Sequence, residues 1–275
     1  MQELTNVSKS PVFQNDDMTE LLSTIDSKLS QMDPITLEQM SGIKLMNRID
    51  TKYLVDVRRL PALLDKAKSD YYVQEIESKR KAFYRTLYYD TSDAKMYTIH
   101  QNRKLNRQKI RVREYVESNL TFLEIKNKNN KGRTKKIRIS VAHDEIKSQQ
   151  AAVDFITEKA NYAVDEISGR LRNQFSRITL VNKGKTERLT IDINIKFDNC
   201  VTGNQNTIPS LCIVEVKRDG NVYSPFTSYM ADFRIKKKSI SKYCLGMILT
   251  DPGLKQNRFK EKLRYIEKML SKNNN

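Results

Sequence analysis

Alternation of apolar and polar residues dominates the chain from residue 45 onward, and this is the pattern of β-strands with one buried face. Leu189, Ile191 and Ile193, for example, alternate with polar residues. The pattern predicts strands over residues 45–55, 71–77, 83–90, 109–117, 121–127, 134–141, 176–182, 187–196 and 211–218. Helical spacing predicts helices over 58–69, 92–101, 144–159 and 165–174, and in pieces from residue 224 onward. Asp56 is positioned to cap the first of these helices, and Pro61 falls in its first turn.

The N-terminal residues 1–34 are polar and lack a sustained period. They are expected to form a flexible tail with one short helix near residues 18–29. The chain has no internal repeat, and no Pro/Gly-rich linker follows residue 45. Residues 35–275 are therefore expected to form one domain that ends in helices.

Lys and Arg dominate the polar face of the predicted strands. Lys109, Arg111 and Arg113 share one face of a strand, because side chains at every second position point the same way. A sheet with one solvated face is the ordinary explanation of such alternation, but so many like charges side by side would repel one another. We therefore expect an α+β fold whose antiparallel sheet closes into a barrel, polar inside and apolar outside under helices. Such an interior requires a multiply charged anion, which makes it a tunnel for a phosphate chain.

Two carboxylates lie on these basic faces. Glu215 shares a face with Lys217, and Glu124 shares one with Lys126. Either carboxylate could neutralise a neighbouring cation, or hold a divalent ion together with phosphate oxygens. The two roles are equally supported for Glu215, and the ion pair is favoured for Glu124.

The overall charge supports a polyanionic ligand. Lys and Arg number 50 against 33 acids, which gives a formal net charge of +17 over 275 residues. Nucleic acid, anionic lipid and polyphosphates all fit that sign. Nucleic acid is disfavoured because aromatic residues do not interleave with the basic ones as a base-stacking surface requires.

The sequence lacks the residues that several common catalytic and binding sites need. Two histidines and three cysteines without C-x-x-C spacing leave little material for a zinc site, a Ser-His-Asp triad or a disulfide framework. Neither a G-x-x-x-x-G-K-[ST] loop nor G-x-G-x-x-G occurs, so side-chain cations must bind any phosphate. The sequence shows no signal peptide and no stretch of about 20 apolar residues, so a cytoplasmic location is expected.

Nine short motifs follow one another along the chain: R-x-D-x-K-Y from Arg48, Y-Y-D-T from Tyr88, R-x-R from Arg111, E-x-K from Glu124, K-x-R from Lys136, F-S-R from Phe175, R-x-T-x-D from Arg188, E-V-K from Glu215 and S-K-Y from Ser241. In order and spacing they resemble the VTC (vacuolar transporter chaperone) polyphosphate polymerase domain, within the triphosphate tunnel metalloenzymes. The resemblance covers about residues 36–250.

The resemblance implies a barrel of about eight strands and a metal-dependent polymerase that transfers the terminal phosphoryl group of ATP to a growing polyphosphate chain. Pyrophosphate or another phosphate would serve as acceptor, and Mn²⁺ or Mg²⁺ would be held by Glu215, with Glu124 as a second candidate ligand. The residues expected to take part in catalysis are Lys52, Arg111, Arg113, Lys126, Arg188 and Lys242. Those expected to bind phosphate are Arg48, Lys109, Lys136, Arg138, Arg177 and Lys217.

The sequence also departs from the pattern of this superfamily. Arg48 and Asp50 stand where tunnel enzymes that hydrolyse triphosphates or cyclise ATP usually carry two glutamates, and Phe175 stands where a tyrosine is often found. A tripolyphosphatase on the same barrel is nevertheless one alternative, and a non-catalytic module that binds polyphosphate or inositol phosphates is another. The membrane-spanning parts that accompany eukaryotic members are missing, so export of the product would need a membrane-protein partner.

Overall fold

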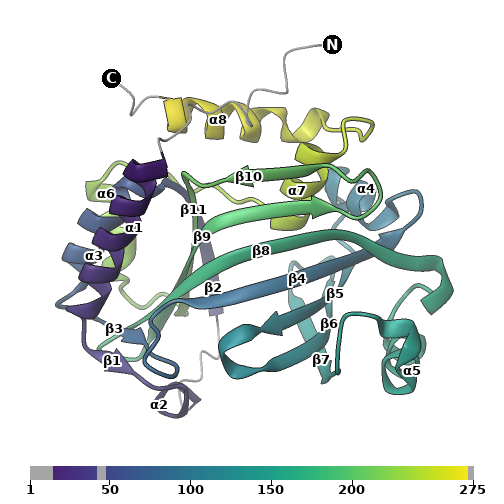
Figure 1. Cartoon of the computed structure of the whole chain (residues 1–275), viewed down its shortest axis with the longest axis horizontal. Helices are drawn as coiled ribbons and strands as arrows, with labels where there is room; N and C mark the ends of the chain where they lie inside the picture. The colour runs from purple at the N-terminus through teal and green to yellow at the C-terminus, as the bar shows by residue number, and fades with distance from the viewer. Residues whose placement is uncertain (1–14, 42–47, 272–275) are drawn as a thin grey trace.

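The computed structural model describes residues 15–41 and 48–271, which form one large sheet with helices around it (Figure 1). The strands are β1 (Pro34–Ile35), β2 (Arg48–Asp56), β3 (Tyr71–Gln74), β4 (Ala82–Thr91), β5 (Arg107–Tyr115), β6 (Leu120–Lys128), β7 (Thr134–Ser140), β8 (Ile167–Asn182), β9 (Glu187–Asn199), β10 (Gln205–Ile208) and β11 (Leu211–Asp219). The helices are α1 (Asn15–Ser30), α2 (Leu37–Ser41), α3 (Leu60–Ala67), α4 (Lys95–Gln101), α5 (Gln150–Lys159), α6 (Pro225–Asp232), α7 (Lys242–Thr250) and α8 (Lys260–Ser271). The expected α+β class is confirmed.

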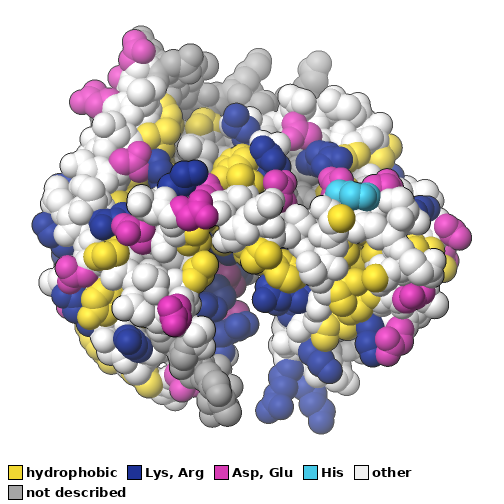
Figure 2. Space-filling model, turned by 60° about the horizontal axis from the view of Figure 1, so that its bottom comes forward, with side chains coloured by type: hydrophobic (Ala, Val, Ile, Leu, Met, Phe, Trp, Pro, Cys, Tyr) yellow, Lys and Arg dark blue, Asp and Glu magenta, His cyan; other side chains and the backbone are white. Residues whose placement is uncertain are grey.

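The sheet runs in the order β2-β11-β9-β8-β4-β5-β6-β7, and each neighbouring pair in this order is antiparallel. In the part of the chain that the structure describes, β2 and β7 are edges that do not pair with each other. The expectation of a closed barrel is therefore wrong, because the sheet is an open, curled half-barrel. Its curl leaves a hollow in which Lys and Arg side chains gather (Figure 2).

The two edges have physical reasons to stay apart. The backbone N–H of Lys238 donates to the carbonyl oxygen of Lys52 at 2.9 Å, and Lys237 forms a β-bridge with Tyr53, so another segment already occupies part of the β2 edge. β7 carries Lys136 and Arg138 on the face that it shares with Glu124 of β6. Pairing β7 with β2 would place these cations beside Lys52, and like charges directly opposite each other are destabilising.

One predicted helix is a strand. Residues 165–174, expected to be helical, form a short 3₁₀ turn followed by the first half of β8. Ile167 and Leu171 are four residues apart, a spacing that fits one face of a helix and equally one face of a strand. β4 pairs with β8 along its whole length, from Ala82 opposite Arg177 to Thr91 opposite Ile167, and this pairing fixes the extended conformation.

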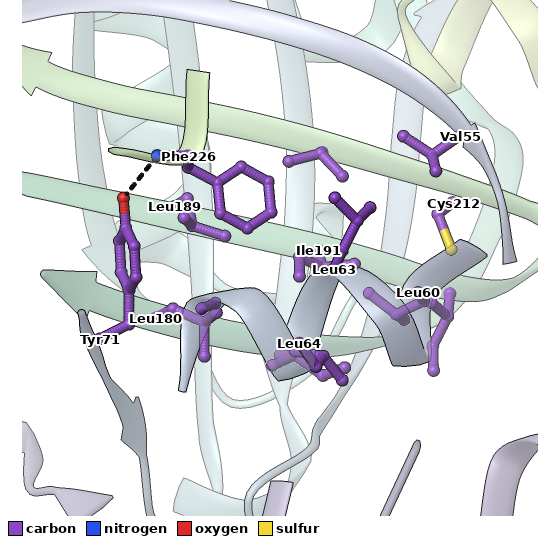
Figure 3. Close-up of a cluster of buried hydrophobic side chains, with 14 of the residues drawn as sticks. Val55, Leu60, Leu63, Leu64, Tyr71, Leu180, Leu189, Ile191, Cys212 and Phe226 are labelled. Atoms are coloured by element: carbon purple, nitrogen blue, oxygen red, sulfur yellow. Dashed lines mark hydrogen bonds between the residues drawn. The ribbon is translucent and has the colours of Figure 1, made fainter. Parts of the chain in front are cut away.

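Helices α1, α3 and α6 cover one region of the sheet with a buried apolar cluster (Figure 3). Leu60, Leu63 and Leu64 of α3 point into this cluster, and the N–H of Phe226 donates to the hydroxyl of Tyr71 at 2.9 Å. The predicted cap is confirmed only in part. The Asp56 carboxylate accepts from the N–H of Arg58 and caps a short 3₁₀ helix over Val57–Arg59, whereas α3 itself begins after Arg59 and has no side-chain cap. α4, α7 and α8 build a second cluster, and α5 packs in a third.

Part of the expected N-terminal tail is packed on the domain. Residues 1–14 lie outside the described residues, and α1 is longer than the short helix that the sequence predicted. Its Ile25 and Leu29 are buried in the cluster that α3 also joins, and Lys28 forms an ion pair with Asp65 at 2.9 Å. The arrangement of residues 35–275 as one domain stays a prediction. Of the helices described, none combines the length and apolar character needed to cross a membrane.

Candidate functional site

The register of β2, β11 and β9 sets one group of charged residues on the concave face of the sheet. Glu215 of β11 lies directly opposite Lys52 of β2 on one side and Thr190 of β9 on the other. Two residues further along, Lys217 lies opposite Arg188. Directly paired residues point to the same side of a sheet, so the first half of the hollow is lined by these cations around one carboxylate.

The register of β5, β6 and β7 sets a second group of charged residues on the concave face, in the other half of the sheet. Arg111 lies opposite Glu124, and Lys109, Lys126 and Lys136 form one direct row across the three strands. Three adjacent lysines of like charge repel each other unless an anion lies between them. We call the hollow between the two halves the cationic cleft.

Charged residues of the two halves also affect each other's pKa. The pKa of Lys126 is lowered to about 8, first by loss of hydration and then by Arg111 of β5. Glu215 of β11, which belongs to the opposite half, opposes that shift. The pKa of Arg188 is lowered by burial, then by Arg48 of β2 and Arg177 of the neighbouring strand β8.

Glu215 is the first of three carboxylates in the cleft that each bridge two cations. One carboxylate oxygen lies 2.5 Å from Nζ of Lys52, and the other lies 2.7 Å from Nζ of Lys217. Burial alone would raise the pKa of Glu215, but the two lysines outweigh it and hold the pKa well below its usual range. The side chain keeps 19% of its surface exposed, so a ligand in the cleft can reach it.

Glu124 is the second carboxylate that bridges two cations. It is more enclosed than Glu215, with only 1% of its side chain exposed. Arg111 Nε donates to one oxygen at 2.7 Å, and Lys136 Nζ donates to the other at 2.9 Å. Burial acts to raise the pKa of Glu124, but Arg111 and further cations lower it to about 2. This carboxylate is therefore ionised and fully paired.

Asp192 is the third carboxylate that bridges two cations, and its contacts join the sheet to helix α7. Arg177 of β8 approaches it in a bidentate arrangement with distances of 2.6 and 2.8 Å, and Lys242 Nζ donates to the same carboxylate. Ser241 caps the first turn of α7, and its hydroxyl also accepts from Lys109 Nζ at 2.8 Å. The start of α7 thereby holds Lys242 at the inner surface of the cleft.

Four further cations of the cleft have no carboxylate within ion-pair distance among residues 15–41 and 48–271: Lys109, Arg113, Lys126 and Arg188. Each shared carboxylate contacts two cations and therefore neutralises only one of the two positive charges. The described cleft thus has a large cationic excess. Arg113 is buried and donates to the Thr86 hydroxyl at 3.1 Å. Cations crowded on one surface repel one another unless an anion lies between them, so the arrangement suits a polyanion.

Two predicted residues lie at the margins of the cleft instead of among these clusters. Arg48 is exposed and pairs with Asp50 at 2.5 Å near the start of β2. Arg138 is exposed on β7, and its guanidinium carbon lies 4.1 Å from the centre of the Phe122 ring. The other predicted phosphate-binding and catalytic residues are brought together.

The sequence placed Tyr88 and Phe175 in two of its motifs, but no aromatic residue was predicted to be a site residue. Tyr84 stacks on Phe175 with ring centres 5.2 Å apart, and Tyr88 lies opposite Arg111. Burial would raise the pKa of Tyr88, but Arg111, Arg113 and further cations lower it to about 8. Positional parity was the available signal, because residues 84, 86 and 88 of β4 share the face that carries the cations.

Residues 47–250 match the family model of the VTC domain. The chain belongs to the VTC domain family. All three shared carboxylates and their cationic partners lie inside the matched region. The cationic cleft is therefore part of the VTC domain itself.

The solved structures that match this chain are distant in sequence. A putative adenylate cyclase from Vibrio parahaemolyticus has 12% identity and a TM-score of 0.43, covering 74% of this chain and 99% of its own. A putative adenylyl cyclase from Hippeastrum, described as having a dominant triphosphatase activity, has 14% identity and a TM-score of 0.43, covering 73% and 95%. The search of curated proteins gives no match. The family assignment rests on the VTC domain match alone.

A divalent metal in this VTC domain would have few protein ligands. Among the described residues, no group of three or more His, Cys, Asp or Glu could together hold a metal ion. Mg²⁺ commonly uses only one or two carboxylates and takes its other ligands from water and substrate phosphates. Glu215 fits that role because it is accessible and its partners are long, flexible lysines. Glu124 fits it poorly, since its side chain is almost completely enclosed and one of its partners is the guanidinium of Arg111.

Proposed function

We propose that this VTC domain is a polyphosphate polymerase that transfers the terminal phosphoryl group of ATP to a polyphosphate chain. The observation that carries the proposal is the cationic excess of one cleft. Three shared carboxylates hold six cations in place there, and four more cations have no acidic partner among the residues that the structure describes. An extended polyphosphate carries negative charge along its whole length, which matches a cleft whose two halves are both lined with cations.

The described residues suit phosphoryl transfer by positioning and charge neutralisation, which supply most of the catalysis in this reaction class. In the transfer, the bond between the γ-phosphorus of ATP and its bridging oxygen breaks, and an oxygen of the acceptor chain bonds to that phosphorus. The acceptor oxygen is already anionic, so no general base is needed. Arg111 and Arg177 present planar guanidinium groups for paired phosphate contacts, and Lys217 and Lys242 act as movable point charges.

We assign the two carboxylates different roles. Glu215 would hold Mn²⁺ or Mg²⁺ together with phosphate oxygens, and the ion would neutralise charge on the transferring phosphoryl group. Glu124 would remain a counter-ion that orients Arg111 and Lys136. This division follows from their exposure, 19% for Glu215 and 1% for Glu124.

The direct test is incubation of the purified protein with ATP and Mn²⁺, followed by sizing of the products on a gel. We expect ADP and long polyphosphate chains to accumulate together. Release of inorganic phosphate without chains would identify a tripolyphosphatase-type hydrolase instead. ATP that binds but is not consumed would identify a binding module, and either result would overturn the polymerase assignment.

Inorganic tripolyphosphate should raise the melting temperature, because it relieves repulsion among the cations and binds only the folded state. At about 100 times its dissociation constant, the gain is about 2.7 kcal/mol, or roughly 5–10 °C for a domain of this size. Differential scanning fluorimetry at low salt measures the shift, with sodium sulfate of equal ionic strength as control. A melting temperature equal to that of the sulfate control would contradict a polyanion-binding cleft.

A further inference from the structure

Four aromatic rings form a continuous row across β6, β5, β4 and β8 at one end of the cationic cleft. Phe122 meets Tyr115 edge-on with ring centres 5.8 Å apart, and Tyr115 meets Tyr84 edge-on at 5.0 Å. Tyr84 then stacks on Phe175 at 5.2 Å. Tyr84 and Phe175 are buried, whereas Tyr115 and Phe122 are half-buried. The outer two rings therefore reach the surface.

On β4, β5 and β6 the row lies near a strand end, whereas Phe175 lies in the middle of β8. Tyr115 is the last residue of β5, and Phe122 is the third of β6. The opposite ends of β5, β6 and β7 carry the direct row of Lys109, Lys126 and Lys136 instead. The cleft thus has two chemically different ends, one of aromatic rings and one of lysines.

Arginines border the aromatic end. Arg138 lies 4.1 Å from the centre of the Phe122 ring, is exposed, and has no ion-pair partner among the residues that the structure describes. On the inner side, Arg113 is the direct cross-strand partner of Phe122 and lies 5.5 Å from the Tyr84 ring. Guanidinium planes and aromatic rings are the surfaces on which nucleobases stack. A phosphate bound to Arg113 would therefore lie directly beside Phe122.

We propose that the Arg138, Phe122 and Tyr115 surface binds the heteroaromatic base of a nucleoside triphosphate, so that ATP enters with its base at the aromatic end. This inference rests on the proposed function and deepens it, because it fixes the direction of the substrate. The triphosphate then runs inward past Arg113 and Arg111, which follow Tyr115 on the same face of β5, and the polyphosphate chain extends towards the lysine row. The surface selects a nucleotide over an inorganic triphosphate, which has no base to stack.

The test compares two ligands on one variant, Phe122→Leu, which keeps an apolar side chain but removes the ring face. Calorimetry with Mn²⁺ present measures the affinity for the β,γ-imido analogue of ATP and for inorganic tripolyphosphate. We expect the nucleotide to bind about tenfold more weakly, because stacking of a base on one ring supplies roughly that factor. Tripolyphosphate affinity should change by less than about twofold, since the phosphate-binding cations remain.

Two control variants separate stacking from damage to the fold. Phe122→Tyr keeps the ring and should retain nucleotide affinity. Phe83 is next to Tyr84 in β4, so its side chain points to the opposite face of the strand. Phe83→Leu therefore removes a ring outside the cleft and should change neither the nucleotide affinity nor the tripolyphosphate affinity. Equal losses for both ligands in Phe122→Leu, or no loss for either, would overturn the base site alone. Failure of the unaltered protein to bind either ligand would overturn the proposed function, and the base site with it.

Discussion

Replacing Asp192 by Asn should lower the free energy of unfolding by about 3–5 kcal/mol, the range observed when one partner of a buried ion pair is removed. The Asp192 side chain is 3% exposed, and its carboxylate is the only acidic partner that the described residues offer to Arg177 and Lys242. Asparagine has the same size but no charge, so both cations would remain buried without compensation. Urea unfolding followed by circular dichroism measures the change.

An exposed ion pair provides the matched control for this variant. Asp232 lies 2.6 Å from Lys66, and both side chains are about half exposed. Asp232→Asn should therefore cost less than about 1 kcal/mol. Tripolyphosphate should restore part of the stability of Asp192→Asn, because its oxygens can replace the lost carboxylate. A loss no larger than that of Asp232→Asn would show that water compensates Arg177 and Lys242 already.

The stability that Asp192 contributes should also depend on pH. Burial acts to raise its pKa, but Arg177 and Lys242 outweigh this and hold the pKa below the ordinary value of 3.8. A carboxyl whose pKa is lower in the folded state stabilises the fold above its unfolded-state pKa. The difference in stability between the unaltered protein and Asp192→Asn should therefore be largest at neutral pH and shrink as the pH falls below about 4.

Alternation in the sequence was sufficient to predict which charged residues share a face. Glu215 and Lys217 are two residues apart in a strand, and a strand admits only one arrangement of such a pair. Their convergence with Lys52 follows once neighbouring strands pair in register. The periodicity of 2 therefore carries most of the information about the cleft.

Closure of the barrel could not be predicted in the same way. Whether two edge strands pair depends on what else reaches their backbone groups, and the pattern within each strand does not encode this. The segment at Lys237 and Lys238 takes part of the β2 edge although it lies about 185 residues further along the chain. The prediction of a helix over residues 165–174 was wrong for a related reason. Pairing with β4, and not the local sequence pattern, makes this segment a strand.

The aromatic residues of the cleft were overlooked because apolar residues were assigned to the outer face of the sheet. Tyr84 and Phe175 are buried, yet they lie among Arg113 and Arg177, whose guanidinium groups pack against their rings at 4.9–5.6 Å. Cation–π contacts make such rings compatible with a cationic surface. Polarity alone therefore does not decide which face of a strand lines a binding site.

Replacing Glu215 by Gln should reduce polyphosphate synthesis from ATP by roughly 10²-fold, comparable to the loss of one preorganised electrostatic group. The substitution keeps the size of the side chain and removes the charge that we propose fixes a divalent ion at the transferring phosphoryl group. Affinity for tripolyphosphate should be kept or increased, because Lys52 and Lys217 lose a competing anion 2.5 and 2.7 Å away. Initial rates with saturating ATP and Mn²⁺ measure the first effect, and calorimetry measures the second.

Asp50 offers the matched control for Glu215, since it lies opposite Lys217 in the same ladder and pairs with Arg48 in a more exposed position. Asp50→Asn removes one negative charge from the same side of the cleft without touching the proposed metal ligand, and its turnover should stay within about threefold of the unaltered protein. If Glu215 served only as a counter-ion, Glu215→Gln would free two lysines for phosphate and leave metal-dependent turnover close to that of Asp50→Asn. Equal rates for the two variants would therefore remove Glu215 from the metal site, whereas a hundredfold gap between them with tripolyphosphate binding intact can arise only if the carboxylate acts in the transfer step itself.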